Sequence, residues 1–102
     1  MFILNLTYKK SLEEVTNWLP AHKDFLDKHY AAGHFVFSGR KTPRNGDIIL
    51  AKGDDLEAIQ TLYQQDPFFI HEIADYELIA FTPTKYSDDF APIVTQAHSA
   101  SD

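Results

Sequence analysis

The sequence has no cysteine, and only four glycines and nine basic residues among its 102 positions. The absence of cysteine excludes disulfide bonds, thiolate metal sites and cysteine nucleophiles. Fifteen acidic residues against nine basic ones give a formal net charge of −6. Nucleic acids and anionic membrane surfaces are bound by basic faces, so neither is an expected partner. No apolar run approaches the length of a membrane-spanning helix, which needs about 20 residues.

The composition that remains is typical of one small folded domain. Hydrophobic residues make up 44% and aromatic residues 14% of the chain, which is enough to build a core. We expect an α+β domain over residues 1–86 and a polar, partly flexible tail over residues 87–102, where small and polar residues accumulate. The opening residues lack the basic region of a signal peptide, and we expect a cytoplasmic protein.

Alternation and turn signals predict four strands and two helices. Ser11 followed by Glu14 forms a capping box, so the first helix begins there, and Gly33 is a suitable residue just past its end. Pro20 cannot donate to the preceding turn and predicts a kink or restart near Trp18. The second helix opens at Asp54. The sequence Asp66–Pro67 is expected to stop it. The strands are expected over residues 2–8, 34–39, 47–52 and 76–81.

This order of elements predicts a ferredoxin-like βαββαβ fold with a four-stranded antiparallel sheet. Right-handed crossovers place the strands at 2–8 and 47–52 in the centre and both helices on one face. The runs Phe35–Phe37 and Ile48–Leu50 offer apolar residues to both faces of the sheet. An uncovered apolar face rarely stays in water. We therefore expect a homodimer in which two open sheet faces pack together, as in a dimeric α+β barrel.

His22 is the first candidate for chemistry. It lies between Trp18 and Phe25 on the apolar stripe of the first helix, so its ring faces the sheet or the crevice beside it. One interpretation is a core histidine with a single satisfied hydrogen bond. The other is a proton-transferring group, because histidine titrates near neutral pH.

Asp66 is the second candidate. If it occupies the last turn of the second helix, it lies at the negative end of the helix dipole, at a cost of about 0.3–1 kcal/mol. It is then either an exposed helix stop that tolerates this cost or a carboxylate with a cationic neighbour. If that neighbour is His22, Asp66 orients the imidazole and fixes its tautomer, which is the arrangement of a base and its orienting acid.

Arg40, Lys41 and Arg44 place three of the nine basic residues in one short segment. They form either a solvated hairpin loop or a site where Arg40 binds a carboxylate or phosphate. Gly39 lets a ligand approach the backbone closely. The remaining histidines have no metal-ligand spacing, so neither a metal nor a cofactor is expected.

Several short motifs together resemble the YciI-like (YCII-related) family over residues 1–86. They are Pro20–Ala21–His22 followed by Phe25–Leu26, Ala32–Gly33 leading into Phe35–Val36, Ser38–Gly39, and Asp66–Pro67–Phe68. The resemblance implies a dimeric α+β barrel and an active site centred on a histidine and an aspartate. Matched by motif, these are His22 and Asp66. Some relatives are dehydrochlorinases of chlorinated hydroxyquinols.

Two functions follow from this combination. The first is an acid–base enzyme of the lyase or isomerase type, acting on a small polar, aromatic or enolic molecule. His22 would transfer the proton, Asp66 would orient it, and Arg40 or the backbone of Gly39 would hold an oxyanion. The expected remaining pocket residues are Tyr8, Phe37, Ser38, Pro67 and Phe68. The alternative is a non-catalytic dimeric module, for ligand binding or assembly, in which His22 and Asp66 are a structural pair.

Overall fold

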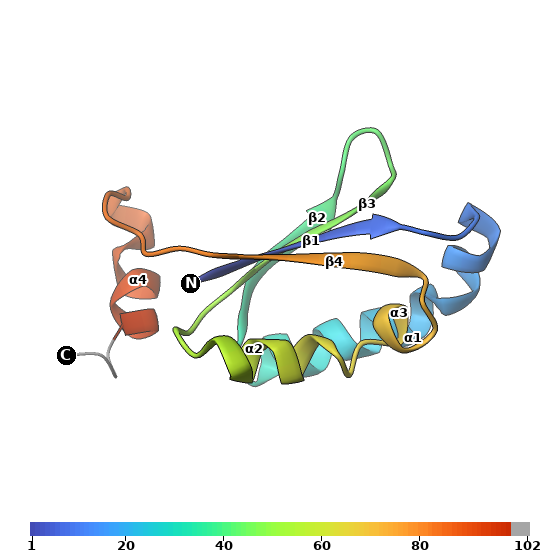
Figure 1. Cartoon of the computed structure of the whole chain (residues 1–102). Helices are drawn as coiled ribbons and strands as arrows, with labels where there is room; N and C mark the ends of the chain where they lie inside the picture. Colours follow the sequence, from blue (N-terminus) through green and yellow to red (C-terminus); the bar gives the residue numbers. More distant parts are fainter. Residues whose placement is uncertain (99–102) are drawn as a thin grey trace.

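The computed structural model describes residues 1–98, in which four strands form one antiparallel sheet (Figure 1). The strand order is β2-β3-β1-β4, so β1 and β3 are central, as the sequence predicts. The observed strands also match the four expected runs closely. Their bounds are β1 Phe2–Tyr8, β2 Phe35–Arg40, β3 Gly46–Ala51 and β4 Ala74–Ala80. The α+β architecture expected from the sequence is therefore confirmed.

Helix α1, Leu12–Ala31, is a single helix that begins and ends where the sequence predicts. The Ser11 hydroxyl accepts the backbone N–H of Glu14, which satisfies one free donor of the first turn. Pro20 lies inside the helix, and the first turns rise steeply from the rest in Figure 1, so the helix bends rather than restarts. Gly33 follows the helix with a φ of +80°, a backbone conformation that glycine adopts without strain.

The second helical segment differs from the expectation. Helix α2, Leu56–Tyr63, ends three residues before Asp66, and a separate short helix α3, Pro67–Ile70, follows. Asp66 is the N-cap of α3, and its side chain accepts the backbone N–H of Phe68. The prediction that Asp66 lies at the negative end of a helix dipole is therefore wrong. Proline is favoured at the first position of a helix, so Asp–Pro here begins a helix.

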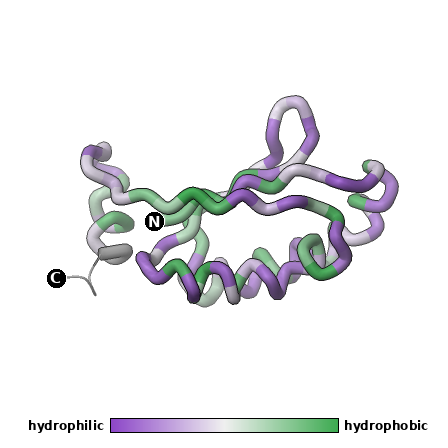
Figure 2. The backbone as a smooth tube through the Cα atoms, in the orientation of Figure 1, coloured by the Kyte–Doolittle hydropathy of each residue, from purple (hydrophilic) through white to green (hydrophobic). Residues whose placement is uncertain are grey.

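Helices α1, α2 and α3 cover one face of the sheet (Figure 1). In Figure 2 the helices alternate between hydrophobic and hydrophilic residues along their length, as a half-buried helix does. Their apolar sides pack on the inward residues of the strands. The core members include Leu4, Leu6, Val15, Ile49 and Phe68, all fully buried.

The other face of the sheet is not covered by these three helices. The strand register brings Ile3 opposite both Leu50 and Ile79 on this face, and Phe37 opposite Leu50. Phe37 is 49% exposed and Ile79 is 43% exposed. This apolar open face is the one that the sequence analysis expects a second copy to cover.

The C-terminal part of the described chain contains helix η1, Asp88–Phe90, and helix α4, Ala91–His98. Both lie beside the end of the sheet that holds the N-terminus (Figure 1). The sequence analysis expected a partly flexible tail over 87–102, of which residues 99–102 lie outside the described residues. Within residues 1–98, no helix is both long and apolar enough to cross a membrane.

Candidate active site

The His22 side chain is buried on the sheet-facing side of α1 and is only 3% exposed. Its ring stacks flat on Phe68 of α3, with centroids 4.0 Å apart and planes inclined by 1°. Nδ1 lies 2.8 Å from Oδ1 and 2.9 Å from Oδ2 of Asp66. The structure therefore joins the two residues that the sequence analysis singled out, although 44 positions separate them in the chain.

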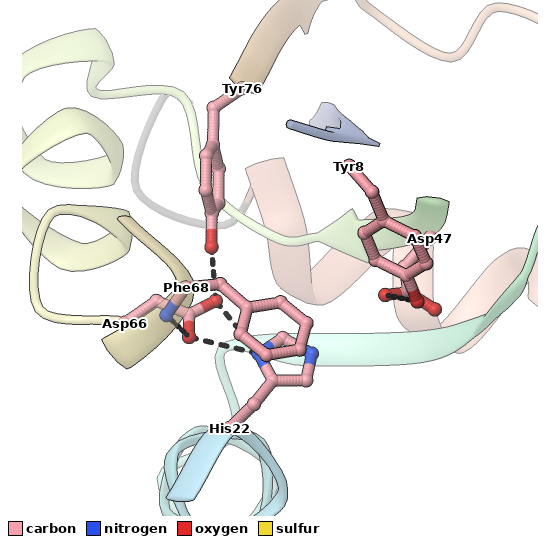
Figure 3. A network of polar contacts seen from close by, with 6 residues as sticks. All are labelled: Tyr8, His22, Asp47, Asp66, Phe68 and Tyr76. Atoms are coloured by element: carbon pink, nitrogen blue, oxygen red, sulfur yellow. Dashed lines mark hydrogen bonds and ion pairs between the residues drawn. The ribbon is translucent and has the colours of Figure 1, made fainter. Parts of the chain in front are cut away.

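Asp66 is fully buried and accepts hydrogen bonds from three donors. Oδ1 accepts the backbone N–H of Phe68 at 3.0 Å, both oxygens face His22 Nδ1, and Oδ2 accepts the hydroxyl of Tyr76 (Figure 3). A buried carboxylate needs such a set of donors to remain ionised. The N-cap position on α3 adds a favourable backbone dipole.

Tyr76 fixes the direction of this network. Burial raises the pKa of Tyr76 above its ordinary value of 10.0, and the charge of Asp66 together with the hydrogen bond to it raises it further. The phenol therefore stays protonated and donates to Asp66. Because the carboxylate can only accept, His22 must donate its Nδ1–H, and in the neutral ring this leaves the lone pair on Nε2.

A cavity of about 410 Å³ adjoins His22. Neither Asp66 nor Tyr76 lines this cavity, and Asp66 is connected to it by its hydrogen bond to the His22 ring. In Figure 3 the second ring nitrogen of His22 lies on the side that faces Tyr8 and Asp47. The lining residues are Tyr8, Leu19, His22, Lys23, Leu26, Ser38, Gly39, Arg40, Arg44 and Asp47.

Tyr8 and Asp47 form a second polar pair in this cavity. The Tyr8 hydroxyl donates to Oδ2 of Asp47 at 3.2 Å. Burial raises the pKa of Asp47 above its ordinary 3.8, whereas the charge of His22, the Tyr8 hydrogen bond and Arg44 act in the opposite direction. Burial and the neighbouring Asp47 also raise the pKa of Tyr8.

The charge of the cavity contrasts with that of the whole chain. Lys23, Arg40 and Arg44 line it against a single carboxyl group, that of Asp47. The chain as a whole has a net charge of −6. A cavity with this excess of cations favours a small anionic ligand, and guanidinium groups bind carboxylates and phosphates with two parallel hydrogen bonds.

The other predicted pocket residues divide into three groups. Tyr8, Ser38, Gly39 and Arg40 line the cavity, and the Ser38 hydroxyl is hydrogen-bonded to the Tyr30 hydroxyl at 2.6 Å. Phe68 lies beneath the His22 ring, and Pro67 is the first residue of α3; neither lines the cavity. Phe37 pairs with Leu50 on the open sheet face, so the structure does not bring it to the cavity.

Asp47 and Tyr76 are polar members of the site that the sequence analysis did not single out. Each lies on the inward face of its strand, in the register position opposite Leu6 of β1. Strict alternation from Ile49 would have placed Asp47 on the inward face of the strand. An acidic residue at such a position is unusual, and it could have marked Asp47 as a candidate site residue.

A second cavity, of about 380 Å³, lies between the end of α1 and the start of α2. It contains His29 and His34, whose Nδ1 atoms are 2.9 Å apart. Burial lowers the pKa of His29, and the neighbouring His34 lowers it further. Among the described residues, no three histidine or carboxylate side chains are grouped so that they could hold a metal ion.

Comparison with known proteins gives a family and a fold. The family model described as the YCII-related domain matches residues 1–82. No curated protein matches the sequence. Among solved structures, the chain is similar to the 5-chloro-2-hydroxyhydroquinone dehydrochlorinase of Burkholderia phenoliruptrix, solved in complex with 2,5-dihydroxybenzoquinone. The TM-score is 0.67 at 14% sequence identity, over 87% of this chain and 98% of the dehydrochlorinase. At this identity the likeness shows a shared fold.

Proposed function

The chain belongs to the YCII-related family, and we propose that it is a small enzyme in which His22 transfers a proton to and from a small anionic substrate. Asp66 is the positioning residue that fixes the tautomer of His22, and Tyr76 holds Asp66. The reaction class is that of a lyase or isomerase, in which a C–H or O–H proton moves without a redox change.

One observation carries this proposal: His22 Nδ1 is held by Asp66 at 2.8 Å while the ring also borders a cavity of about 410 Å³. A purely structural histidine needs only its hydrogen bond. Here the bonded nitrogen faces the buried carboxylate, and the other nitrogen faces a space that can hold a small molecule. This is the arrangement of a general base with its orienting acid.

The charge and shape of the cavity support a substrate class. The cations Lys23, Arg40 and Arg44 favour a carboxylate, phosphate or enolate group, and the rings and alkyl chains of Tyr8, Leu19 and Leu26 favour a planar apolar body. The structural neighbour acts on a chlorinated hydroxyhydroquinone, a small aromatic molecule with ionisable hydroxyl groups. Both features support a small aromatic or enolic anion.

The proposal is tested with two probes of this class. Phenylpyruvate is anionic, aromatic and enolisable, and exchange of its C3 protons for deuterium is followed by NMR in D₂O. Chloride release from 5-chloro-2-hydroxyhydroquinone is followed in parallel. We expect catalysis of at least one reaction, and His22→Gln should lower its rate constant by about 10²–10⁴-fold, the usual contribution of a general base.

Glutamine keeps a donor for Asp66 at position 22, so the variant separates proton transfer from folding. The exposed variants Asp24→Asn and His71→Ala serve as matched controls and should retain wild-type rates. Binding of both probes without any catalysed reaction would overturn the proposal in favour of a non-catalytic binding module. A rate for His22→Gln within about threefold of wild type, far less than the loss of a general base, would overturn it too.

We also propose that two copies associate through their open sheet faces. Ile3, Phe37, Leu50 and Ile79 support this, because they form a partly exposed apolar group on one face of the sheet, which is typical of an interface. Sedimentation should give about twice the 11.7 kDa chain mass, and Phe37→Asp should give the single-chain mass. Leu56→Asp is the matched control, since Leu56 and Phe37 are both 49% exposed but Leu56 lies on α2. A wild-type protein of single-chain mass would contradict this assembly.

A further inference from the structure

We propose that Asp47 is a second catalytic residue of the same cavity, which exchanges a proton with the substrate on the side opposite His22 Nε2, while Tyr8 positions it. The site then performs paired proton shifts, with one group removing a proton as the other supplies one. This inference rests on the proposed function and adds to it the second acid–base group and the class of step.

The placement of Asp47 is the first support. It pairs with Leu6 of β1 and Arg40 of β2, so its side chain is on the inward face of β3 and borders the cavity. In Figure 3 the Asp47 carboxyl and the Tyr8 hydroxyl lie across from the ring nitrogen of His22 that Asp66 does not occupy. A carboxyl group on an inward strand position has an energetic cost that a structural role must justify.

Its hydrogen bonding is the second support. Within the described residues, the Asp47 carboxyl accepts one hydrogen bond, from the Tyr8 hydroxyl to Oδ2. At 3.2 Å this hydrogen bond is rather long. Asp66, by contrast, accepts three donors and does not border the cavity. The two carboxyl groups therefore have different roles. The hydrogen bonds of Asp66 are taken up by protein donors, and Asp66 holds His22, whereas the carboxyl of Asp47 can still accept or donate a hydrogen bond to a ligand.

The charges of the two groups are coupled. A positive His22 favours the ionised form of Asp47, while burial favours its neutral form. The pair has the same total charge in two states. In one state His22 is neutral and Asp47 is protonated, and in the other His22 is protonated and Asp47 is ionised. A proton shift between these two states through the substrate therefore adds no net charge to a partly buried site, which lowers its cost.

The step balances in atoms and electrons. In an enolisation, His22 Nε2 takes the C–H proton and the C–H electron pair forms the C=C bond. The C=O π pair moves to the oxygen, where it forms an O–H bond with the proton from Asp47. In an elimination, the same C–H electron pair forms the double bond, and the leaving group departs with the Asp47 proton. Neither route needs an oxidant or reductant. Arg40 or Arg44 holds the anionic group of the substrate, so both routes apply to carboxylated or enolic molecules.

The test uses the phenylpyruvate exchange assay with Asp47→Asn, whose amide oxygen still accepts the Tyr8 hydroxyl. We expect the exchange rate constant to fall by about 10²–10⁴-fold while the KM stays level or decreases, because removing a negative charge does not weaken binding of an anion. Asp24→Asn is the matched control. A role of Asp47 in binding alone would instead raise the KM at an unchanged rate constant and would overturn the proposal.

The dependence of the exchange rate on pH distinguishes a catalytic Asp47 from a structural one, because a purely structural Asp47 would not change it. Exchange that needs protonated Asp47 falls as the pH rises through the pKa of Asp47. Since the Tyr8 hydrogen bond lowers the pKa of Asp47, Tyr8→Phe should move this limb to higher pH, and Asp47→Asn should remove it. The groups that bear on Asp47 from the surrounding elements are Tyr8, His22, Lys23, Arg40, Arg44 and Asp66.

A titration without substrate keeps the inference separable from the proposed function. The carboxyl ¹³C resonance of Asp47 is followed in wild type and in His22→Gln. Loss of the His22 charge should raise the titration midpoint of Asp47. An unchanged Asp47 midpoint would overturn the pairing. If His22→Gln is inactive and Asp47→Asn is fully active, this inference fails and the proposed function stands. An inactive wild type removes both.

Discussion

Replacement of Asp66 by asparagine tests the centre of the site. The wild-type carboxylate accepts three buried donors, from His22, Phe68 and Tyr76. Asp66→Ala would leave all three unpaired, at about 1–3 kcal/mol each. That is comparable with the total free energy of unfolding of a small domain, about 5–15 kcal/mol. Asparagine is therefore the informative change, because its oxygen still accepts the Phe68 N–H.

The asparagine amide presents one acceptor and one donor to His22 Nδ1, so it no longer selects the Nδ1–H tautomer. The Nε2–H form should then become populated, and this form cannot accept a proton at the cavity. We expect the free energy of unfolding to fall by about 1–3 kcal/mol, the cost of one poorly satisfied buried group. The exchange rate constant should fall by about 10²–10⁴-fold, as for loss of a correctly oriented base.

Two measurements check this prediction. Two-dimensional ¹⁵N–¹H spectra of the imidazole distinguish the tautomers of His22, and urea unfolding gives the change in stability. Asp24→Asn, an exposed change on the same helix as His22, controls for the loss of one negative charge. Unaltered His22 ¹⁵N shifts, with a stability within about 0.5 kcal/mol of wild type as for ordinary surface substitutions, would refute the assignment of Asp66 as the residue that orients His22.

Three further outcomes follow from the structure. Tyr76→Phe removes a donor from buried Asp66 and should lower the free energy of unfolding by about 1–3 kcal/mol in urea titrations; no loss would mean that water replaces the phenol. Gly46→Ala should destabilise by at least about 1–3 kcal/mol, because a Cβ there would lie 1.7 Å from a backbone oxygen of β1, whereas Gly39→Ala, which meets nothing within 4 Å, should cost much less; equal thermal midpoints for the two variants would contradict this. Because burial lowers the pKa of His29 below its ordinary 6.5, the unfolded chain binds this proton first as the pH falls, so His29 should reduce stability below about pH 6.5; urea midpoints that decline equally in wild type and His29→Gln would exclude the effect.

Local signals in the sequence were sufficient for the order and type of most elements. The capping box at Ser11, the glycine after α1 and the alternation of β1 act over a few residues, so no tertiary information is needed to interpret them. The Asp66–Pro67 pair was misinterpreted because Asp–Pro can mark either the end or the beginning of a helix, and here it begins α3. Only the backbone path after Tyr63 distinguishes the two uses.

The sequence by itself determined the fold class, because hydrophobic periodicity and caps are local and the βαββαβ order admits few right-handed topologies. It also identified His22 and Asp66 as candidate site residues. His22 was identified by its position on the apolar stripe of the first helix, and both residues by family resemblance. Only the tertiary structure placed the Tyr76 hydroxyl against Asp66. It also placed Asp47 across from His22. These contacts join β4, α3, β3 and α1, and they depend on strand register and helix placement, which no local pattern specifies.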